Sequence, residues 1–77
     1  TPAVLEKIAR AEEFLKGLGL ALVRVRAHGS VARIETDDGG FAAIAARRAE
    51  VVSALRESGF VHVSIDLAGY RTGSLNE

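Results

Sequence analysis

The sequence predicts a small two-layer α+β domain, in which helices cover one face of a three-stranded mixed sheet. Two observations support this fold class. Apolar residues recur every three or four positions in two segments and every second position in three others, which are the periods of helices and strands. The segments follow in the order helix, strand, strand, helix, strand, so a hairpin is joined to a third strand by a right-handed crossover. A chain of 77 residues has room for one such domain.

The first helix is predicted to begin at Thr1 and Pro2, an N-cap residue followed by a proline in the first turn. It is expected to end at Gly17 and Gly19. Its apolar face repeats at spacings of three and four and consists of Val4, Ile8, Ala11, Leu15 and Leu18.

Two strands follow, over residues 21–26 and 31–36, and each alternates apolar with polar side chains. We expect His28-Gly29 to form the hairpin turn. That turn pairs Val25 with Ala32, Val23 with Ile34, Arg24 with Arg33 and Leu22 with Glu35.

A second helical region is expected after Asp37-Asp38-Gly39-Gly40, because aspartates cap the first turn of a helix well. Arg47-Arg48 interrupt its apolar set, which predicts a break near Ala46; that set comprises Phe41, Ile44, Ala45, Val51, Val52 and Leu55. Residues 60–66 form the third strand, with Val61, Val63 and Ile65 facing inward and His62, Ser64 and Asp66 outward. Residues 67–77 are rich in glycine and polar side chains and should be irregular.

The composition excludes several classes of function. Ten basic and ten acidic residues give zero net charge, which argues against a surface built wholly for nucleic acid or anionic lipid. The absence of cysteine removes disulfides, thiolate metal sites and any cysteine nucleophile. We find no signal peptide and no apolar segment long enough for a membrane helix, so we expect a cytoplasmic chain. Because the chain has no Met and begins at Thr1-Pro2, we expect it to be excised from a longer protein.

Arg24, Arg26 and Arg33 project from the outward side of the hairpin, and we call this the arginine face. Like charges so close together repel unless something negative lies between them. One interpretation is a bound phosphate or carboxylate, which the planar guanidinium holds bidentately. The other is an ordinary solvated face that Glu35, Asp66 and Glu77 neutralise.

Two weaker candidates lie nearby. Glu35, His62 and Asp66 could bind a divalent metal on the outward side, although their spacing matches no metal motif and a strand histidine is usually only solvated. The segment Gly69-Tyr70-Arg71-Thr72-Gly73-Ser74 is either a frayed terminus or an arm whose Arg71 closes over an anion. No hydrolase triad and no glycine-rich phosphate loop is evident.

Four motifs together span nearly the whole chain: Ala11-Glu12-Glu13-Phe14-Leu15; Arg24-Val25-Arg26-x-His28-Gly29 with Ala32-Arg33-Ile34-Glu35; Gly59-Phe60-Val61-His62-Val63; and Asp66-Leu67-x-Gly69-Tyr70-Arg71-x-Gly73-Ser74-Leu75-Asn76-Glu77. They resemble the C-terminal domain of the ATP-dependent sacrificial sulfur transferases, which belong to the PP-loop ATP pyrophosphatases. The resemblance implies that residues 1–77 are a single domain from the C-terminal part of such a protein.

The resemblance also implies a reaction for the whole protein. In that family, an N-terminal PP-loop domain adenylates a carboxylate of a pyridinium nucleotide precursor with ATP. A cysteine of the protein then gives up its sulfur to make the thiocarboxylate, leaving dehydroalanine, and the product becomes the nickel pincer cofactor of lactate racemase. By position, Arg24, Arg26 and Arg71 match arginines that contact the substrate phosphate, while Glu12 and Glu35 match acidic residues near the sulfur donor, where a metal can bind.

The implied partners are the N-terminal PP-loop domain of the same polypeptide, a phosphate-bearing small molecule and further copies of the protein. The implied cofactors of the whole protein are ATP with magnesium, with nickel as a further candidate, and none belongs to this chain by itself. The resemblance places no catalytic residue in this chain.

The sequence departs from the family in one large respect, because it lacks both the PP-loop motif SGGxDS and the sacrificial cysteine. This chain alone therefore cannot bind ATP in the family manner or donate sulfur. Two alternatives stay open: a free-standing module that binds anions or RNA, and a purely structural oligomerisation domain. Zero net charge, and an arginine face on which we expect no aromatic side chain, argue against RNA.

Overall fold

The computed structural model describes residues 1–71 and confirms the predicted fold class. In chain order it contains helix α1 (Pro2–Gly17), strands β1 (Val23–His28) and β2 (Val31–Thr36), helices α2 (Asp38–Ala46) and α3 (Arg48–Glu57), and strand β3 (His62–Ile65). Residues 67–71 form no further helix or strand, as expected, whereas β3 is shorter than the predicted 60–66 and ends before Asp66. The rest of the segment predicted to be irregular, residues 72–77, lies outside the described part of the chain.

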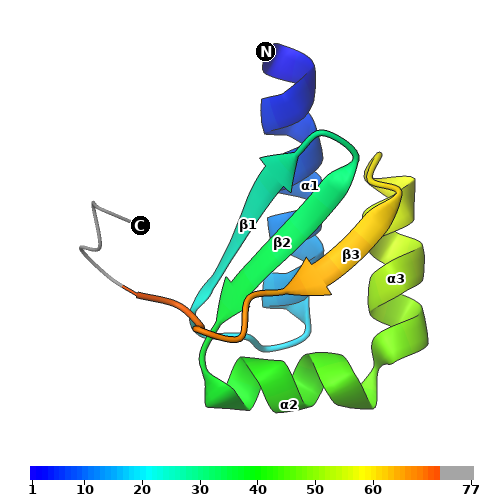
Figure 1. Ribbon diagram of the computed structural model, residues 1–77. Coiled ribbons are helices and arrows are strands. Elements are labelled where there is room, and N and C mark those ends of the chain that lie inside the picture. The colour runs from blue at the N-terminus through cyan, green and yellow to red at the C-terminus, as the bar shows by residue number, and fades with distance from the viewer. Residues whose placement is uncertain (72–77) are drawn as a thin grey trace.

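Strand β2 is the centre of the sheet, antiparallel to β1 and parallel to β3. Helices α2 and α3 make the crossover from β2 to β3. Figure 1 shows α1 behind the sheet, α3 alongside β3, and α2 across the end of the sheet at which β2 finishes. The opposite face of β1 and β2 is not covered by any helix of residues 1–71.

The predicted pairing of the hairpin is wrong by two residues. Arg24 pairs with Glu35, Val25 with Ile34 and Arg26 with Arg33, and the two-residue loop is Gly29-Ser30. The reason is Gly29, whose φ of +59° suits the first position of such a loop and is accessible to glycine without strain. Because the side chains of a strand alternate with a period of two, this shift leaves each side chain on its predicted face.

The helix termini confirm the predicted caps. The Thr1 hydroxyl accepts a hydrogen bond from the Val4 N–H at 3.2 Å, and the Asp37 carboxylate accepts one from the Gly40 N–H at 2.8 Å. The predicted break lies at Arg47, whose φ of −121° and ψ of 38° separate α2 from α3. Each helix can therefore turn its own apolar side toward the sheet.

The core lies between the helices and the inward face of the sheet. Leu15, Ile34 and Leu55 are fully buried, so each of α1, β2 and α3 contributes a side chain to the same cluster. The whole buried cluster consists of Ala11, Leu15, Leu20, Val25, Ala32, Ile34, Ile44, Val51, Leu55 and Phe60.

Three side chains that the sequence places inward are exposed, and the smallest of them is Ala45 of α2. Val61 is 52% exposed because β3 begins only at His62, and the buried Phe60 takes the place just before it. Phe41 is 40% exposed because α2 packs through Gly40 and Ile44, which lie one turn apart, and Phe41 points about 100° away from that line. None of these differences alters the order of the elements.

No helix formed by residues 1–71 is long and apolar enough to cross a bilayer.

A carboxylate occupies the free edge of β1. The Val25 N–H, which points away from β2, donates to the Glu12 carboxylate of α1 at 2.9 Å. Unpaired amides at a sheet edge invite pairing with other chains, and a side-chain acceptor at that position prevents it. Glu12 thus joins α1 to the residue that lies between Arg24 and Arg26.

Replacing Gly40 with alanine should destabilise the chain by about 1–3 kcal/mol, since a Cβ atom there would overlap the Oγ1 atom of Thr36. Thr36 is buried and donates a hydrogen bond of 2.6 Å to the Leu22 carbonyl, so it cannot easily move. The matched control is Gly39→Ala, where the nearest atom is 3.7 Å away and the helix should gain roughly 0.5–1 kcal/mol. Urea unfolding of both variants measures the difference, and equal midpoints would contradict the prediction.

Replacing Glu12 with alanine should lower the free energy of unfolding by about 1–2 kcal/mol, because the Val25 N–H loses a charged acceptor. Glu12→Gln keeps an acceptor oxygen and should lose less than half as much. Glu13→Ala, on the exposed side of the same turn, should stay within about 0.5 kcal/mol of the original chain. Chemical denaturation of the three variants tests this order, and a Glu12→Ala variant as stable as Glu13→Ala would disprove it.

Candidate functional site

The arginine face is the outward side of β1 and β2. Its residues alternate along the strands with buried core residues, so Arg24 and Arg26 flank the buried Val25, and Arg33 lies between the buried Ala32 and Ile34. A side chain on a paired strand has its backbone fixed, so the three guanidinium groups start from a rigid base. The structure confirms that these arginines share one side of the hairpin.

Glu35 contacts two of the three arginines. One of its carboxylate oxygens lies 3.5 Å from Arg26 Nε, and the other lies 3.2 Å from Arg33 Nη2. Its side chain is only 15% exposed, so water screens these contacts less than at an open surface. Arg33 has a second carboxylate neighbour, since its Nε atom lies 3.7 Å from Asp66 Oδ2. The interpretation as a self-neutralised face is therefore correct for Arg26 and Arg33.

Arg24 differs from the other two arginines. It makes no ion pair with any of residues 1–71, although it stands opposite Glu35 in the register. Its guanidinium carbon instead lies 5.6 Å from the centre of the Tyr70 ring. The expectation that this face has no aromatic side chain is wrong, because the segment after β3 brings Tyr70 onto it. Within residues 1–71, the three arginines of this face and their two carboxylate neighbours leave one net positive charge, and it lies at Arg24.

The remaining predicted phosphate ligand, Arg71, follows Tyr70 directly and is exposed. The Tyr70 N–H donates to the Thr36 carbonyl at 2.9 Å, so the chain is attached to the end of β2 one residue before Arg71. The segment that sequence reasoning left open as a frayed terminus or an arm is thus held at residue 70. Residues 72–74 of that segment, and the candidate neutralising residue Glu77, lie outside the described residues.

The two predicted acidic metal ligands are engaged separately. Glu12 accepts from the backbone at the edge of β1, while Glu35 binds arginines on the arginine face. His62 is exposed on β3, and Asp66 contacts Arg33. Residues 1–71 contain no group of three or more histidine or acidic side chains that could hold a metal ion. The donor set described here does not fit a metal by itself, so a metal at Glu12 or Glu35 needs ligands from elsewhere.

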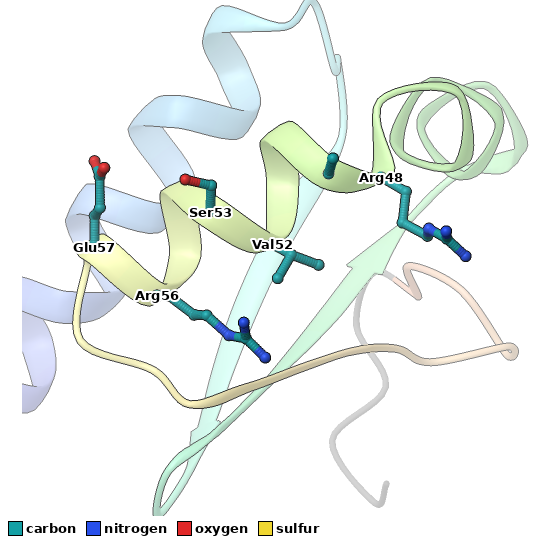
Figure 2. Close-up of a pocket in the computed structure, with 6 residues that line it drawn as sticks. Arg48, Val52, Ser53, Arg56 and Glu57 are labelled. Atoms are coloured by element: carbon teal, nitrogen blue, oxygen red, sulfur yellow. The ribbon is translucent and has the colours of Figure 1, made fainter.

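A shallow groove of about 690 Å³ lies on the outward side of α3, away from every predicted site residue. Figure 2 shows Arg48, Val52 and Arg56 directed toward the same side of the helix. Arg56 Nε donates to the Val61 carbonyl at 3.2 Å, which ties this side of α3 to the start of β3. Its lining residues are Arg48, Ala49, Val52, Ser53, Arg56 and Glu57.

Sequence reasoning missed the contribution of Tyr70 and the pairing within the arginine face. The alternation of the strands shows which residues share a face, but it does not show which arginine lacks a carboxylate. The signal for Tyr70 was its place between Gly69 and Arg71, which is consistent with a turn but does not say where the ring lies. As a whole, the face carries three arginines, of which Arg24 alone makes no ion pair with any of residues 1–71.

No family model matches the chain. Among curated proteins, the pyridinium-3,5-bisthiocarboxylic acid mononucleotide synthase of Lactiplantibacillus plantarum is 34% identical over 73 residues, which cover 95% of this chain and 26% of that protein. A second relative, the uncharacterized protein slr1717 of Synechocystis sp., is 36% identical over 74 residues, covering 94% of this chain and 28% of that protein. The chain therefore spans about a quarter of the length of these relatives.

Both alignments run over almost the whole of the present chain, including the hairpin that carries the arginine face. They confirm the family resemblance found in the sequence motifs. The chain is homologous to the C-terminal region of pyridinium-3,5-bisthiocarboxylic acid mononucleotide synthase, and it belongs with that region of the sacrificial sulfur transferases.

Proposed function

We propose that this chain is the C-terminal accessory domain of an ATP-dependent sacrificial sulfur transferase, and that its arginine face binds the phosphate of a pyridinium nucleotide. In this proposal the whole protein converts carboxylates of the nucleotide to thiocarboxylates. The observation that carries it is Arg24, a guanidinium group that makes no ion pair with any of residues 1–71, on a face where the other two arginines contact carboxylates. The homology supports it, since the relative is named for a mononucleotide, a molecule that carries one phosphate.

Phosphate suits this site for electrostatic reasons. A guanidinium group offers two parallel N–H donors to two oxygens of one phosphate, and such charge-assisted bonds are stronger than neutral ones. Arg26 Nε lies 3.5 Å from one oxygen of Glu35, which is long for a charged hydrogen bond. The Arg26 side chain can therefore turn toward an anion beside Arg24. Arg71 follows the anchored Tyr70 and supplies the third arginine of the proposed set.

The chemistry of sulfur transfer lies elsewhere in this proposal. ATP with magnesium would bind the N-terminal PP-loop domain, because this chain lacks the SGGxDS motif, and the donor cysteine would come from outside the chain. Nickel, or another metal near Glu12 and Glu35, would require ligands from that domain or from another copy.

The proposal also includes contacts with the N-terminal domain and between copies of the protein. Exposed apolar side chains support it, since Leu67 is 87% exposed and Val61 is 52% exposed at the two ends of the edge strand β3. Burying such side chains on association removes apolar area from water. Sedimentation of the whole protein tests this part, and a monomer at micromolar concentration would exclude contacts between copies.

Replacing Arg24 with alanine in the whole protein should weaken binding of nicotinic acid mononucleotide about tenfold or more, because a charge-assisted hydrogen bond contributes about 1.5–3 kcal/mol. Arg48→Ala removes an exposed arginine of α3 and should leave binding unchanged. Calorimetric titration measures the affinity of both variants. The charge reversal Arg24→Glu should also abolish loss of the cysteine sulfur, which is read from the intact mass of the protein.

The phosphate requirement is tested with the nucleoside that lacks it. Nicotinic acid riboside should bind the unmodified protein at least tenfold more weakly than the mononucleotide, and Arg24→Ala should remove most of that difference. An unchanged preference for the mononucleotide in Arg24→Ala would refute the assignment of this face. Tight binding of single-stranded RNA at low salt would instead favour the RNA-binding alternative.

A further inference from the structure

We propose that Tyr70 is a positioning residue, which holds Arg24 in the orientation that receives the phosphate and at the same time fixes the start of Arg71. This inference rests on the proposed function and extends it from the arginines to the residue that orders them. It is carried by three observations: the isolation of Arg24, the position of the Tyr70 ring, and the attachment of residues 66–70 to the sheet.

Arg24 lacks the carboxylate contacts that hold Arg26 and Arg33 within the described part of the chain. Arg26 and Arg33 each contact Glu35, and Arg33 also lies near Asp66, whereas Arg24 makes no ion pair with any of residues 1–71. It lies on β1, an edge strand, and its side chain is exposed. A free arginine side chain samples many rotamers, and binding an anion with it costs that freedom. A group that restricts Arg24 beforehand therefore strengthens anion binding.

Tyr70 provides that restriction without using the hydrogen-bonding edge of the guanidinium. The Arg24 Cζ atom lies 5.6 Å from the ring centre, within the range of a cation–π contact. An aromatic ring contacts a guanidinium group without a carboxylate's hydrogen bonds, so the N–H donors of Arg24 stay available to an anion. Glu35 contacts Arg26 and Arg33 at Nε or Nη2 and so occupies donors that a phosphate would need. Of these partners, the Tyr70 ring alone leaves the donors free.

The segment after β3 is built to hold Tyr70 in place. The Asp66 carboxylate accepts from the Ala68 N–H at 2.9 Å, and the Asp66 carbonyl accepts from the Gly69 N–H at 3.0 Å, which closes a turn. Gly69 has a φ of +81°, a conformation that disfavours other residues. The Tyr70 N–H then donates to the Thr36 carbonyl at 2.9 Å. Figure 1 shows this segment crossing from the end of β3 past the ends of β2 and β1.

The segment of residues 66–70 thus contacts residues of all three strands. It leaves β3 through Asp66, which also contacts Arg33; it is anchored to β2 at Thr36; and its ring reaches Arg24 on β1. Because Arg71 follows the anchored residue, this one attachment fixes the starting point of Arg71 and also places the ring that contacts the Arg24 side chain. The loss of the Tyr70 ring should therefore weaken phosphate binding although no phosphate contact is removed.

The test is a double-mutant cycle on the whole protein, with nicotinic acid mononucleotide as the probe and calorimetric affinity as the readout. Tyr70→Ala should weaken binding about fivefold, and Tyr70→Phe, which keeps the ring, should stay within about twofold of the unmodified protein. In the Arg24→Ala background, Tyr70→Ala should have a much smaller effect than alone. Tyr70→Ala should leave affinity for nicotinic acid riboside unchanged, a result that a general loss of structure would not produce.

Gly69→Ala provides a second variant that touches neither arginine. A Cβ atom there would lie 3.1 Å from the Thr36 carbonyl oxygen in an unfavourable backbone conformation, so it should displace Tyr70 and weaken binding to a similar extent. Urea unfolding of the 77-residue chain confirms that each variant is folded.

The outcomes separate the two proposals. If Arg24→Ala leaves mononucleotide binding unchanged, the phosphate site itself is wrong, and the role of Tyr70 falls with it. If Arg24→Ala weakens binding but Tyr70→Ala does not, or weakens it equally in both backgrounds, the phosphate site stands and the positioning role is overturned. Strong coupling between the two substitutions, with rescue by Tyr70→Phe, establishes the role.

Discussion

The two faces of β2 impose the constraint on which the rest of this molecule depends. On the inward face, Ala32 and Ile34 are fully buried against helices α1 and α3. On the outward face, Arg33 and Glu35 form an ion pair at 3.2 Å, and no helix of residues 1–71 covers it. Because β2 is paired on both sides, it cannot turn or slide without breaking both layers. A domain of this size has a thin core, and its central strand must serve core and surface together.

This arrangement separates the charges of the arginine face into two kinds. Glu35 stands on the rigid central strand, contacts Arg26 of β1 and Arg33 of its own strand, and is mostly shielded from water. Arg24 stands on the edge strand and is left with an aromatic partner. A cluster in which every arginine had its own carboxylate would have little attraction for an external anion. The uneven distribution concentrates the remaining positive charge at one position, and that position aligns with the phosphate contact that the family resemblance implies.

At the edges and ends of the sheet, single contacts serve both stability and the placement of the site residues. Glu12 covers an unpaired amide of β1, Arg56 binds the carbonyl of Val61 before β3, and Thr36 receives the N–H of Tyr70. Each contact satisfies a backbone group that a three-stranded sheet leaves unpaired. The contacts also locate the functional groups, because Glu12 holds the residue between Arg24 and Arg26, and the Tyr70 contact holds the residue before Arg71. Stability and site geometry therefore depend on the same hydrogen bonds.

The sequence by itself determined the fold class, the helix caps at Thr1 and Asp37, the break near Ala46 and the grouping of three arginines on one face. These features follow from period, capping chemistry and alternation, which act between residues close together in the chain. The homology to a sulfur transferase region was also readable from local motifs. The hairpin register was not, because it depended on whether His28-Gly29 or Gly29-Ser30 formed the loop, and both choices preserve the alternation. Only the tertiary structure decided which arginine of the face makes no ion pair within residues 1–71 and where the Tyr70 ring lies, since sequence spacing does not record which side chains meet in space.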